Sequence, residues 1–480
     1  MDRARTIFFG YQVGGCSTIN YSYTDSPWRL FAWDIYHFFR LVWSLPWMVI
    51  PIRPQDSGAF SELAPTPENI RCLAVVVGTT VFVAVNRAFC LLLNKGCTRL
   101  YTSDMKYAMP LPEHAHEEWI FVNGMAVGEH WLQNNLNRLA LTFGRPVIGI
   151  HNKTNGIVFD IIECLVQRNL NYATCDTRAC YRIVKQKLYD PKLSKVILIL
   201  HSQGGVEGGL VVDWILQELP LDLLSKLEVY TFGNAANHFN NPHRHAVSQQ
   251  LAQLNPTRAI ETVTRTIPQS SPVSTTTSGE SSRPPYRDGR RHSLTSISTK
   301  THPAVQDRAI SHVEHYAHTT DFAALWGVLH FATSPLASQT VPRFIGRLFI
   351  RASNSGGHQF CQHYLDGMFP LERNPETGEF VGAAEDNEFM ESAVHVGVEG
   401  DASRHVREAF DISWRGSNGF GSGVVVGDVD VHQDGDQVSR PLDGSVVRVK
   451  YLSRLWQYRN GRVPHDVSPL LTSGQLGSMR

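Results

Sequence analysis

The hydrophobic and polar positions of residues 117–370 follow two alternating periods. Short apolar runs bounded by turn residues predict buried strands, and apolar residues recurring every three to four positions predict helices between them. Strands are expected over residues 117–124, 146–151, 195–200, 227–233, 311–318 and 346–352. Helices are expected over residues 129–143, 156–169, 203–218 and 322–332, and from about residue 359 onward. Strands that alternate with helices predict an α/β fold, a mostly parallel sheet with helices on both faces.

Two polar segments interrupt or end this alternation. Residues 265–306 are rich in Ser, Thr, Pro and Arg and nearly free of large apolar side chains, so we expect a disordered insertion there. Residues 373–480 are polar and glycine-rich, and we expect a largely disordered tail with a short basic helix near residues 446–460. That helix either docks on the body of the protein or contacts anionic lipid. The α/β domain is therefore expected over residues 111–372.

The N-terminal region, residues 1–110, contains two hydrophobic segments. Residues 26–53 hold four of the ten tryptophans. A helix there would either lie in a membrane interface, where Trp and Tyr are favoured, or pack against the protein's own core. Residues 72–93 are apolar and long enough, as a helix, to span the hydrocarbon of a bilayer. We favour a membrane helix over the alternative, a soluble hairpin with strands at residues 73–77 and 81–85.

Charge and cysteine content exclude several classes of protein. The chain has 44 Lys and Arg residues and 44 Asp and Glu residues, so no basic excess points to nucleic acid. Its eight cysteines are too scattered for a disulfide-stapled secreted domain, which indicates a reducing, intracellular setting. The first residues also lack the pattern of a signal peptide.

The run VILILHSQGG, residues 196–205, leaves a buried strand through a serine and two glycines. A serine hydroxyl is a good nucleophile only where a base removes its proton and the developing oxyanion is stabilised. A sharp strand-to-helix turn with small neighbours presents a serine in this way, so Ser202 is the candidate nucleophile and the backbone N–H of Gln203 a candidate oxyanion donor. This run resembles the nucleophile elbow G-x-S-x-G of α/β-hydrolases, with Leu200 in place of the first glycine.

The residues that would activate Ser202 follow it in the order that α/β-hydrolases use, first the acid and then the histidine. Asp321 comes just after the strand 311–318, and His358 follows a Gly-Gly turn after the last strand. We expect His358 to take the proton of Ser202 and Asp321 to orient the imidazole. The backbone N–H of Met125, in the loop after the first core strand, is expected to be the second oxyanion donor.

Other histidines are expected to have structural roles. His201 is expected to line the elbow, and His363 to pack in the helix that follows His358. His312, His315 and His318 occur on one expected strand, where a spacing of three puts the middle side chain on the opposite face. We therefore expect no metal site.

Residues 117–370 resemble the lipase-like serine esterase branch of the α/β-hydrolase superfamily, on the elbow and the ordered Ser202, Asp321 and His358. The resemblance implies hydrolysis of carboxylic esters, often of lipids, through an acyl-enzyme and without a metal or organic cofactor. Together with the N-terminal segments it predicts a membrane-associated enzyme with a cytoplasmic-facing catalytic domain and a lipid acyl ester as substrate. The same three residues suit an acyltransferase or thioesterase, and an inactive hydrolase fold serving as a membrane scaffold is the alternative from another class.

Overall fold

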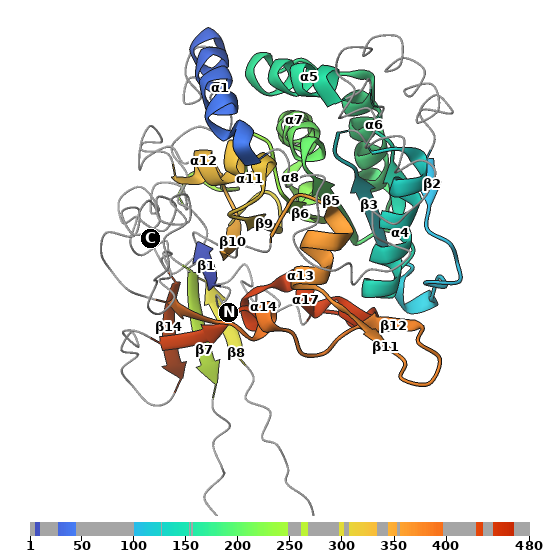
Figure 1. Ribbon diagram of the computed structural model, residues 1–480. Helices are drawn as coiled ribbons and strands as arrows, with labels where there is room; N and C mark the ends of the chain where they lie inside the picture. The colour runs from blue at the N-terminus through green and yellow to red at the C-terminus, as the bar shows by residue number, and fades with distance from the viewer. Residues whose placement is uncertain are drawn as a thin grey trace, which may run out of the picture.

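An eight-stranded sheet in the order β1-β10-β9-β6-β5-β3-β4-β2 forms the centre of the protein (Figure 1). The six inner strands are parallel, and β1 and β2 pair antiparallel at the two edges. The computed structural model describes residues 5–9, 27–44, 100–247 without 126, 153, 155 and 156, 261–266, 297–301, 307–333, 344–352, 356–396, 429–434 and 445–464. The expected α/β class with a mostly parallel sheet is confirmed.

The elements alternate along the chain much as the hydrophobic pattern predicts. The strands of the large sheet are β1 (Arg5–Phe9), β2 (Leu100–Thr102), β3 (Glu117–Val122), β4 (Ile148–Ile150), β5 (Lys195–His201), β6 (Leu227–Phe232), β9 (His312–His318) and β10 (Arg347–Ala352). The main helices are α1 (Pro27–Leu41), α4 (Glu129–Phe143), α5 (Ile157–Leu170), α6 (Cys175–Tyr189), α7 (Gln203–Glu218), α11 (Phe322–Trp326), α12 (Val328–Thr333) and α13 (Asp366–Met368), with the π-helix η6 (Phe360–Leu365). The helices α4 and α7 have the bounds expected from the sequence.

The two faces of the sheet bury different kinds of side chain. Alternation along β5 puts Leu198 and Leu200 on one face and Ile197 and Ile199 on the other. The face with Leu198 is mainly aliphatic and packs against α1, α5, α6, α7, α11 and α12. The opposite face is rich in aromatic side chains and packs against α4, η6, α13 and the C-terminal segment. Helices thus cover both faces, as a parallel sheet requires.

Two helices differ from the expectation. The helix expected over residues 322–332 is broken at Gly327, where a Cβ atom would lie 2.1 Å from the carbonyl oxygen of Asn234. Contact with the loop after β6 therefore divides it into α11 and α12. The helix α6 was not expected, because its buried positions include only two large aliphatic residues, Val184 and Leu188. The hydroxyl of Thr174 caps this helix by accepting a hydrogen bond from the backbone of Thr177.

The N-terminal helix α1 is amphipathic rather than hydrophobic on all sides. Its buried residues include Asp34, whose carboxylate accepts hydrogen bonds from Arg168 at 2.8 Å and from Asn169 at 2.6 Å. The expectation of hydrophobic N-terminal helices is therefore not met by α1, and residues 72–93 lie outside the described residues. Among the helices in the described ranges, none is both long and apolar enough to cross a bilayer.

The chain after residue 372 returns to the body of the protein, which corrects the expectation of a largely disordered tail for the parts that the structure describes. Two short helices, α16 (Val449–Leu452) and α17 (Arg454–Gln457), replace the single basic helix expected near residues 446–460. Leu455 and Trp456 are buried in the aromatic core cluster. This segment therefore docks on the sheet, and the domain boundary expected at residue 372 divides residues that share one core.

Strands also occur at the two ends of the segment expected to be disordered. β7 (Glu261–Thr266) pairs antiparallel with β8 (Ile297–Thr301) and parallel with β14 (Val429–Asp434) in a small separate sheet. The structure thus describes strands at both ends of the segment for which we expect disorder. Residues 267–296 lie outside the described residues.

Three buried glutamates lie near the amino ends of parallel strands on the aromatic face. On each strand, the aromatic residue two positions later donates a hydrogen bond to the glutamate. The pairs are Trp119 with Glu117 at 3.1 Å, Tyr230 with Glu228 at 2.7 Å and Tyr316 with Glu314 at 2.7 Å. A buried carboxylate needs further donors, because an unpaired charge away from water costs several kcal/mol.

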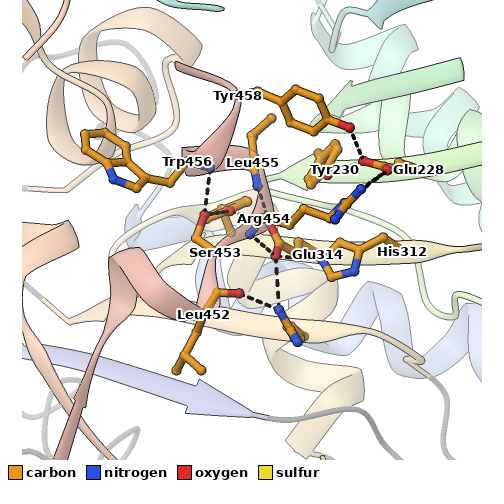
Figure 2. A network of polar contacts seen from close by, with 12 residues as sticks. Glu228, Tyr230, His312, Glu314, Leu452, Ser453, Arg454, Leu455, Trp456 and Tyr458 are labelled. Atoms are coloured by element: carbon orange, nitrogen blue, oxygen red, sulfur yellow. Dashed lines mark hydrogen bonds and ion pairs between the residues drawn. The ribbon is translucent and has the colours of Figure 1, made fainter. Parts of the chain in front are cut away.

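The C-terminal segment supplies most of those further donors, as Figure 2 shows around Arg454. The guanidinium of Arg454 donates to Oε1 of Glu228 at 2.8 and 3.0 Å, and its backbone N–H donates to Glu314 at 2.7 Å. The hydroxyl of Tyr458 donates to Oε2 of Glu228 at 3.0 Å. Burial is the largest single influence on the pKa of Glu228 and would raise it. The charge and the hydrogen bonds of Arg454, together with the charges of Lys195 and His312, outweigh burial and hold that pKa below its usual value. The positive charge of Arg454 in the C-terminal segment and the negative charge of Glu228 in the sheet thus neutralise each other in a buried contact.

Candidate active site

The candidate site lies at the carboxyl ends of two neighbouring parallel strands, β3 and β5. After these strands the chain continues on opposite faces of the sheet. β3 continues into α4 on the aromatic face, whereas β5 continues into α7 on the aliphatic face. In open α/β sheets ligands bind at the carboxyl ends of the strands where connections diverge in this way. Ser202 stands at the carboxyl end of β5, directly before α7.

The backbone of Ser202 is strained. Its φ of 58° and ψ of −121° fall in a region that residues with a side chain rarely adopt, at a cost of about 1–3 kcal/mol. Hydrogen bonds on both sides hold this conformation: the Ser202 N–H donates to the carbonyl of Phe232 at 3.0 Å, and its own carbonyl accepts from Gly205 at 2.9 Å and Ala235 at 3.2 Å. The strand-to-helix corner expected from the sequence is therefore present as a tight turn.

Leu200, which stands in place of the first glycine of the elbow pattern, fits because of a glycine on the following helix. A Cβ atom added to Gly208 would lie 2.2 Å from Cδ1 of Leu200. The side chain of Leu200 thus occupies the space that a larger residue at position 208 would need. Gly208 therefore accommodates Leu200 across the contact between the strand and the helix.

Asp321 and His358 contact each other directly. Nδ1 of His358 lies 2.8 Å from Oδ1 of Asp321, and since a carboxylate only accepts, the imidazole carries its proton on Nδ1. Asp321 also accepts hydrogen bonds from the backbone of Ala323 at 2.8 Å and from the hydroxyl of Tyr364 at 2.6 Å. Burial, together with the nearby charge of Asp321, raises the pKa of Tyr364, so this hydroxyl remains a donor.

His201 links the elbow to His358. Its Nε2–H donates to the backbone carbonyl of His358 at 2.8 Å, and the two imidazole rings stack with centroids 4.8 Å apart. Burial, with the neighbouring His358, lowers the pKa of His201 to about 3. His201 is therefore neutral at physiological pH and lines the elbow.

Loops from other strand ends reach the same place. A Cβ atom added to Gly124, after β3, would lie 2.6 Å from Cβ and 3.1 Å from Oγ of Ser202. One added to Gly233, after β6, would lie 2.5 Å from Oδ2 of Asp321. Loops after β3, β5, β6, β9 and β10 therefore converge around Ser202, Asp321 and His358.

The structure does not join all three residues by hydrogen bonds. Among the described residues, no group hydrogen-bonds to the hydroxyl of Ser202, which is fully buried. Hydrogen bonds between a nucleophile and its base are often long without substrate and tighten in the reacting complex. The structure thus presents an Asp321–His358 pair that His201 connects to the residue next to it in sequence, Ser202, whose hydroxyl is unpaired.

The expected oxyanion donors, Gln203 and Met125, belong to two segments that reach Ser202. Gln203 is the first residue of α7, and its side chain donates to Gln167 at 3.0 Å, which ties the start of the helix to α5. Met125 is buried and directly follows Gly124, the residue that approaches Ser202. Asn123 anchors this loop by accepting a hydrogen bond from the backbone of Asn152 at 2.7 Å.

The remaining histidines have partners in separate places. His363 lies in η6, accepts a hydrogen bond from the backbone of Gln359 at 2.9 Å, and has a pKa lowered to about 4 by burial. His312 binds Glu314, His315 binds Thr231 and His318 binds the carbonyl of His363. Within the described ranges, no three His, Cys, Asp or Glu side chains are grouped as metal ligands.

No family model, curated protein or solved structure matches this chain. The geometry of Ser202, Asp321 and His358 is therefore the main indication of function. Sequence reasoning had not found Tyr364 and Asn123, since their roles depend on contacts between distant loops.

Filling the space between Leu200 and α7 is expected to destabilise the protein. Gly208→Ala should lower the free energy of unfolding by about 1–3 kcal/mol, because its methyl group overlaps the buried Leu200 side chain. Combining it with Leu200→Ala should cost at least about 1 kcal/mol less than the sum of the two single changes, measured by urea unfolding. The matched control is Gly209→Ala, whose Cβ would meet its nearest atom at 3.5 Å and which should be neutral or stabilising. Additive single changes would contradict the proposed contact.

Proposed function

We propose that this protein is a serine hydrolase of the α/β-hydrolase type that cleaves carboxylic esters through an acyl-enzyme on Ser202. The observation that supports this most strongly is the strained Ser202 at the strand-to-helix corner, together with the 2.8 Å contact between His358 and Asp321. Strain of this kind persists only where the surrounding structure enforces it, and it concentrates at functional sites.

In the proposed reaction, Nε2 of His358 takes the proton of the Ser202 hydroxyl as its oxygen attacks the ester carbonyl. The imidazolium that forms is stabilised by the charge of Asp321, which Tyr364 and the backbone of Ala323 hold in place. The backbone N–H groups of Gln203 and Met125 would receive the oxyanion. His358 then gives the proton to the departing alcohol, and water releases the acid by the same steps in reverse.

The ester class inferred from the resemblance is a lipid acyl ester. An acyltransferase or thioesterase would use the same three residues with another acceptor or leaving group. An inactive scaffold would retain the fold without the chemistry. These possibilities differ in what Ser202 does, so labelling of that residue separates the enzymes from the scaffold.

The wild-type chain is expected to react with a fluorophosphonate probe, and Ser202→Ala is expected to lose all labelling. Ser225→Ala, a serine in the surface turn before β6, is the matched control and should label like wild type. His358→Ala should slow labelling by at least about a hundredfold, because it removes the general base. Labelling that persists in Ser202→Ala would place the nucleophile elsewhere. An unlabelled wild-type protein that nevertheless folds would favour the scaffold.

A further inference from the structure

Helix α1 turns its aromatic side away from the body of the protein. Its inward face contains Leu30, Asp34 and Leu41, all buried, and Asp34 is fixed by its hydrogen bonds to Arg168 and Asn169. At about 100° per residue these three positions fall on one side of the helix. The carboxylate of Asp34 therefore binds inside the protein, and its hydrogen bonds fix which side of α1 faces the body of the protein.

Large aromatic side chains form the outward face of α1 and of the short turn at residues 42–44 that follows it. Their exposed fractions are Trp28 73%, Phe39 67%, Tyr36 55%, Trp33 45% and Trp43 44%. The neighbouring helix α5, beside α1 in Figure 1, adds Phe159 and Ile162, which are 44% and 51% exposed. We call these seven residues the aromatic surface. Soluble proteins rarely expose so many large apolar side chains together unless they bind something there.

The charged residues of α1 itself divide between its two sides. Arg29 and Arg40 are exposed, whereas the only acid in the helix, Asp34, is buried against Arg168. Tryptophan and tyrosine are favoured at the boundary between lipid headgroups and hydrocarbon, and basic residues beside them are attracted to anionic headgroups. We propose that the aromatic surface docks on an anionic lipid bilayer, with α1 lying in the plane of the interface.

The aromatic surface is connected to the candidate active site through the inward side of α1. The ring of Phe38 packs edge-on against Phe322 with centroids 5.5 Å apart, and Phe322 directly follows Asp321. His37 contacts His330 of α12 in the same region, at 4.1 Å between centroids. Docking of α1 therefore brings the loop that holds Asp321 toward the bilayer. The binding itself does not depend on the proposed hydrolysis.

The test uses the full chain and sedimentation with vesicles of phosphatidylcholine alone or mixed with phosphatidylserine. The wild-type protein should bind the mixed vesicles more tightly, and added salt should weaken binding. Trp33→Ala combined with Phe39→Ala should weaken binding at least about tenfold, since the bilayer would lose its contact with two exposed aromatic side chains. Met105→Ala combined with Met109→Ala is the matched control, because these side chains are 70% and 69% exposed outside the aromatic surface.

Circular dichroism and thermal unfolding of each variant establish that the fold is retained. Equal binding of the wild type to neutral and mixed vesicles would overturn the proposal, as would unchanged binding of the Trp33 and Phe39 variant. The wild-type chain could instead fail to bind vesicles and form a dimer that the Trp33 and Phe39 variant does not form. That result would assign the aromatic surface to contact with a second copy of the chain. Since vesicle binding and fluorophosphonate labelling are separate measurements, failure of one does not imply failure of the other.

Discussion

Replacing Arg454 with methionine is expected to lower the free energy of unfolding by about 3–5 kcal/mol, because it leaves the buried carboxylate of Glu228 without its countercharge. The midpoint of thermal unfolding should fall by roughly 10 °C. The effect should be large although position 454 is far from the sheet in sequence. Arg454 also places its backbone N–H on Glu314, so disturbance of this residue reaches two buried carboxylates.

Two further variants make this prediction specific. Adding Glu228→Gln to Arg454→Met removes the unpaired charge and should restore part of the lost stability. Arg448→Ala tests an ion pair of the same segment, that with Glu391, in which the Arg448 side chain is 55% exposed. Its cost should stay below about 1 kcal/mol. If Arg448→Ala and Arg454→Met lowered the midpoint of thermal unfolding equally, the burial of Glu228 would not be what makes its contact with Arg454 important for stability.

Lowering the pH from 6.5 to 4.5 is expected to destabilise the fold steeply. Burial lowers the pKa of His201 to about 3 and those of His315 and His363 to about 4, so all three stay neutral in the folded protein over this range. In the unfolded chain each binds a proton below about pH 6.5. The unfolded state therefore takes up more protons, and stability falls as the pH falls.

One buried carboxyl opposes this effect. Burial, with the nearby charges of Asp176 and Glu163, raises the pKa of Glu207 well above its usual value, so the folded state holds a proton there that the unfolded state has released. On acidification, His201, His315 and His363 contribute three protons that favour the unfolded state, and Glu207 contributes one that favours the folded state. The lowered pKa values of His37 and His114 act in the same direction as those of the three histidines. Stability is therefore expected to fall by at least about 3 kcal/mol per pH unit.

Urea unfolding followed by circular dichroism at several pH values between 6.5 and 4.5 measures this slope. His315→Gln should reduce the slope by about 1.4 kcal/mol per pH unit, whatever it does to stability at neutral pH, because one titrating histidine is removed. His315 is suited to this test, since its ring binds Thr231 and packs against Phe239 and Phe344, away from Ser202. A stability that is flat over this range would contradict neutral buried histidines.

Local sequence patterns predicted much of the sheet and several helices because each depends on which side of an element is buried. β5 and α7 have the simplest patterns, a continuous apolar run and a glycine-rich segment whose residues 203–213 are all buried. The C-terminal segment has no such pattern, since α16 and α17 are four residues each and are stable only through their contacts. A local signal for those contacts exists in the repeated glutamate two positions before an aromatic residue, at Glu117, Glu228 and Glu314.

The sequence by itself determined the alternation of strands and helices and the order in which Ser202, Asp321 and His358 follow each other. Periodicity and turn residues are local properties, so they can be recognised without knowing what each element contacts. Only the tertiary structure decided that Gly208 makes room for Leu200, that Arg454 neutralises Glu228, and that α1 buries Asp34 while its tryptophans face outward. Each of these depends on a partner far away in the chain, and a buried charge or a tight contact is determined by that partner rather than by its neighbours in sequence.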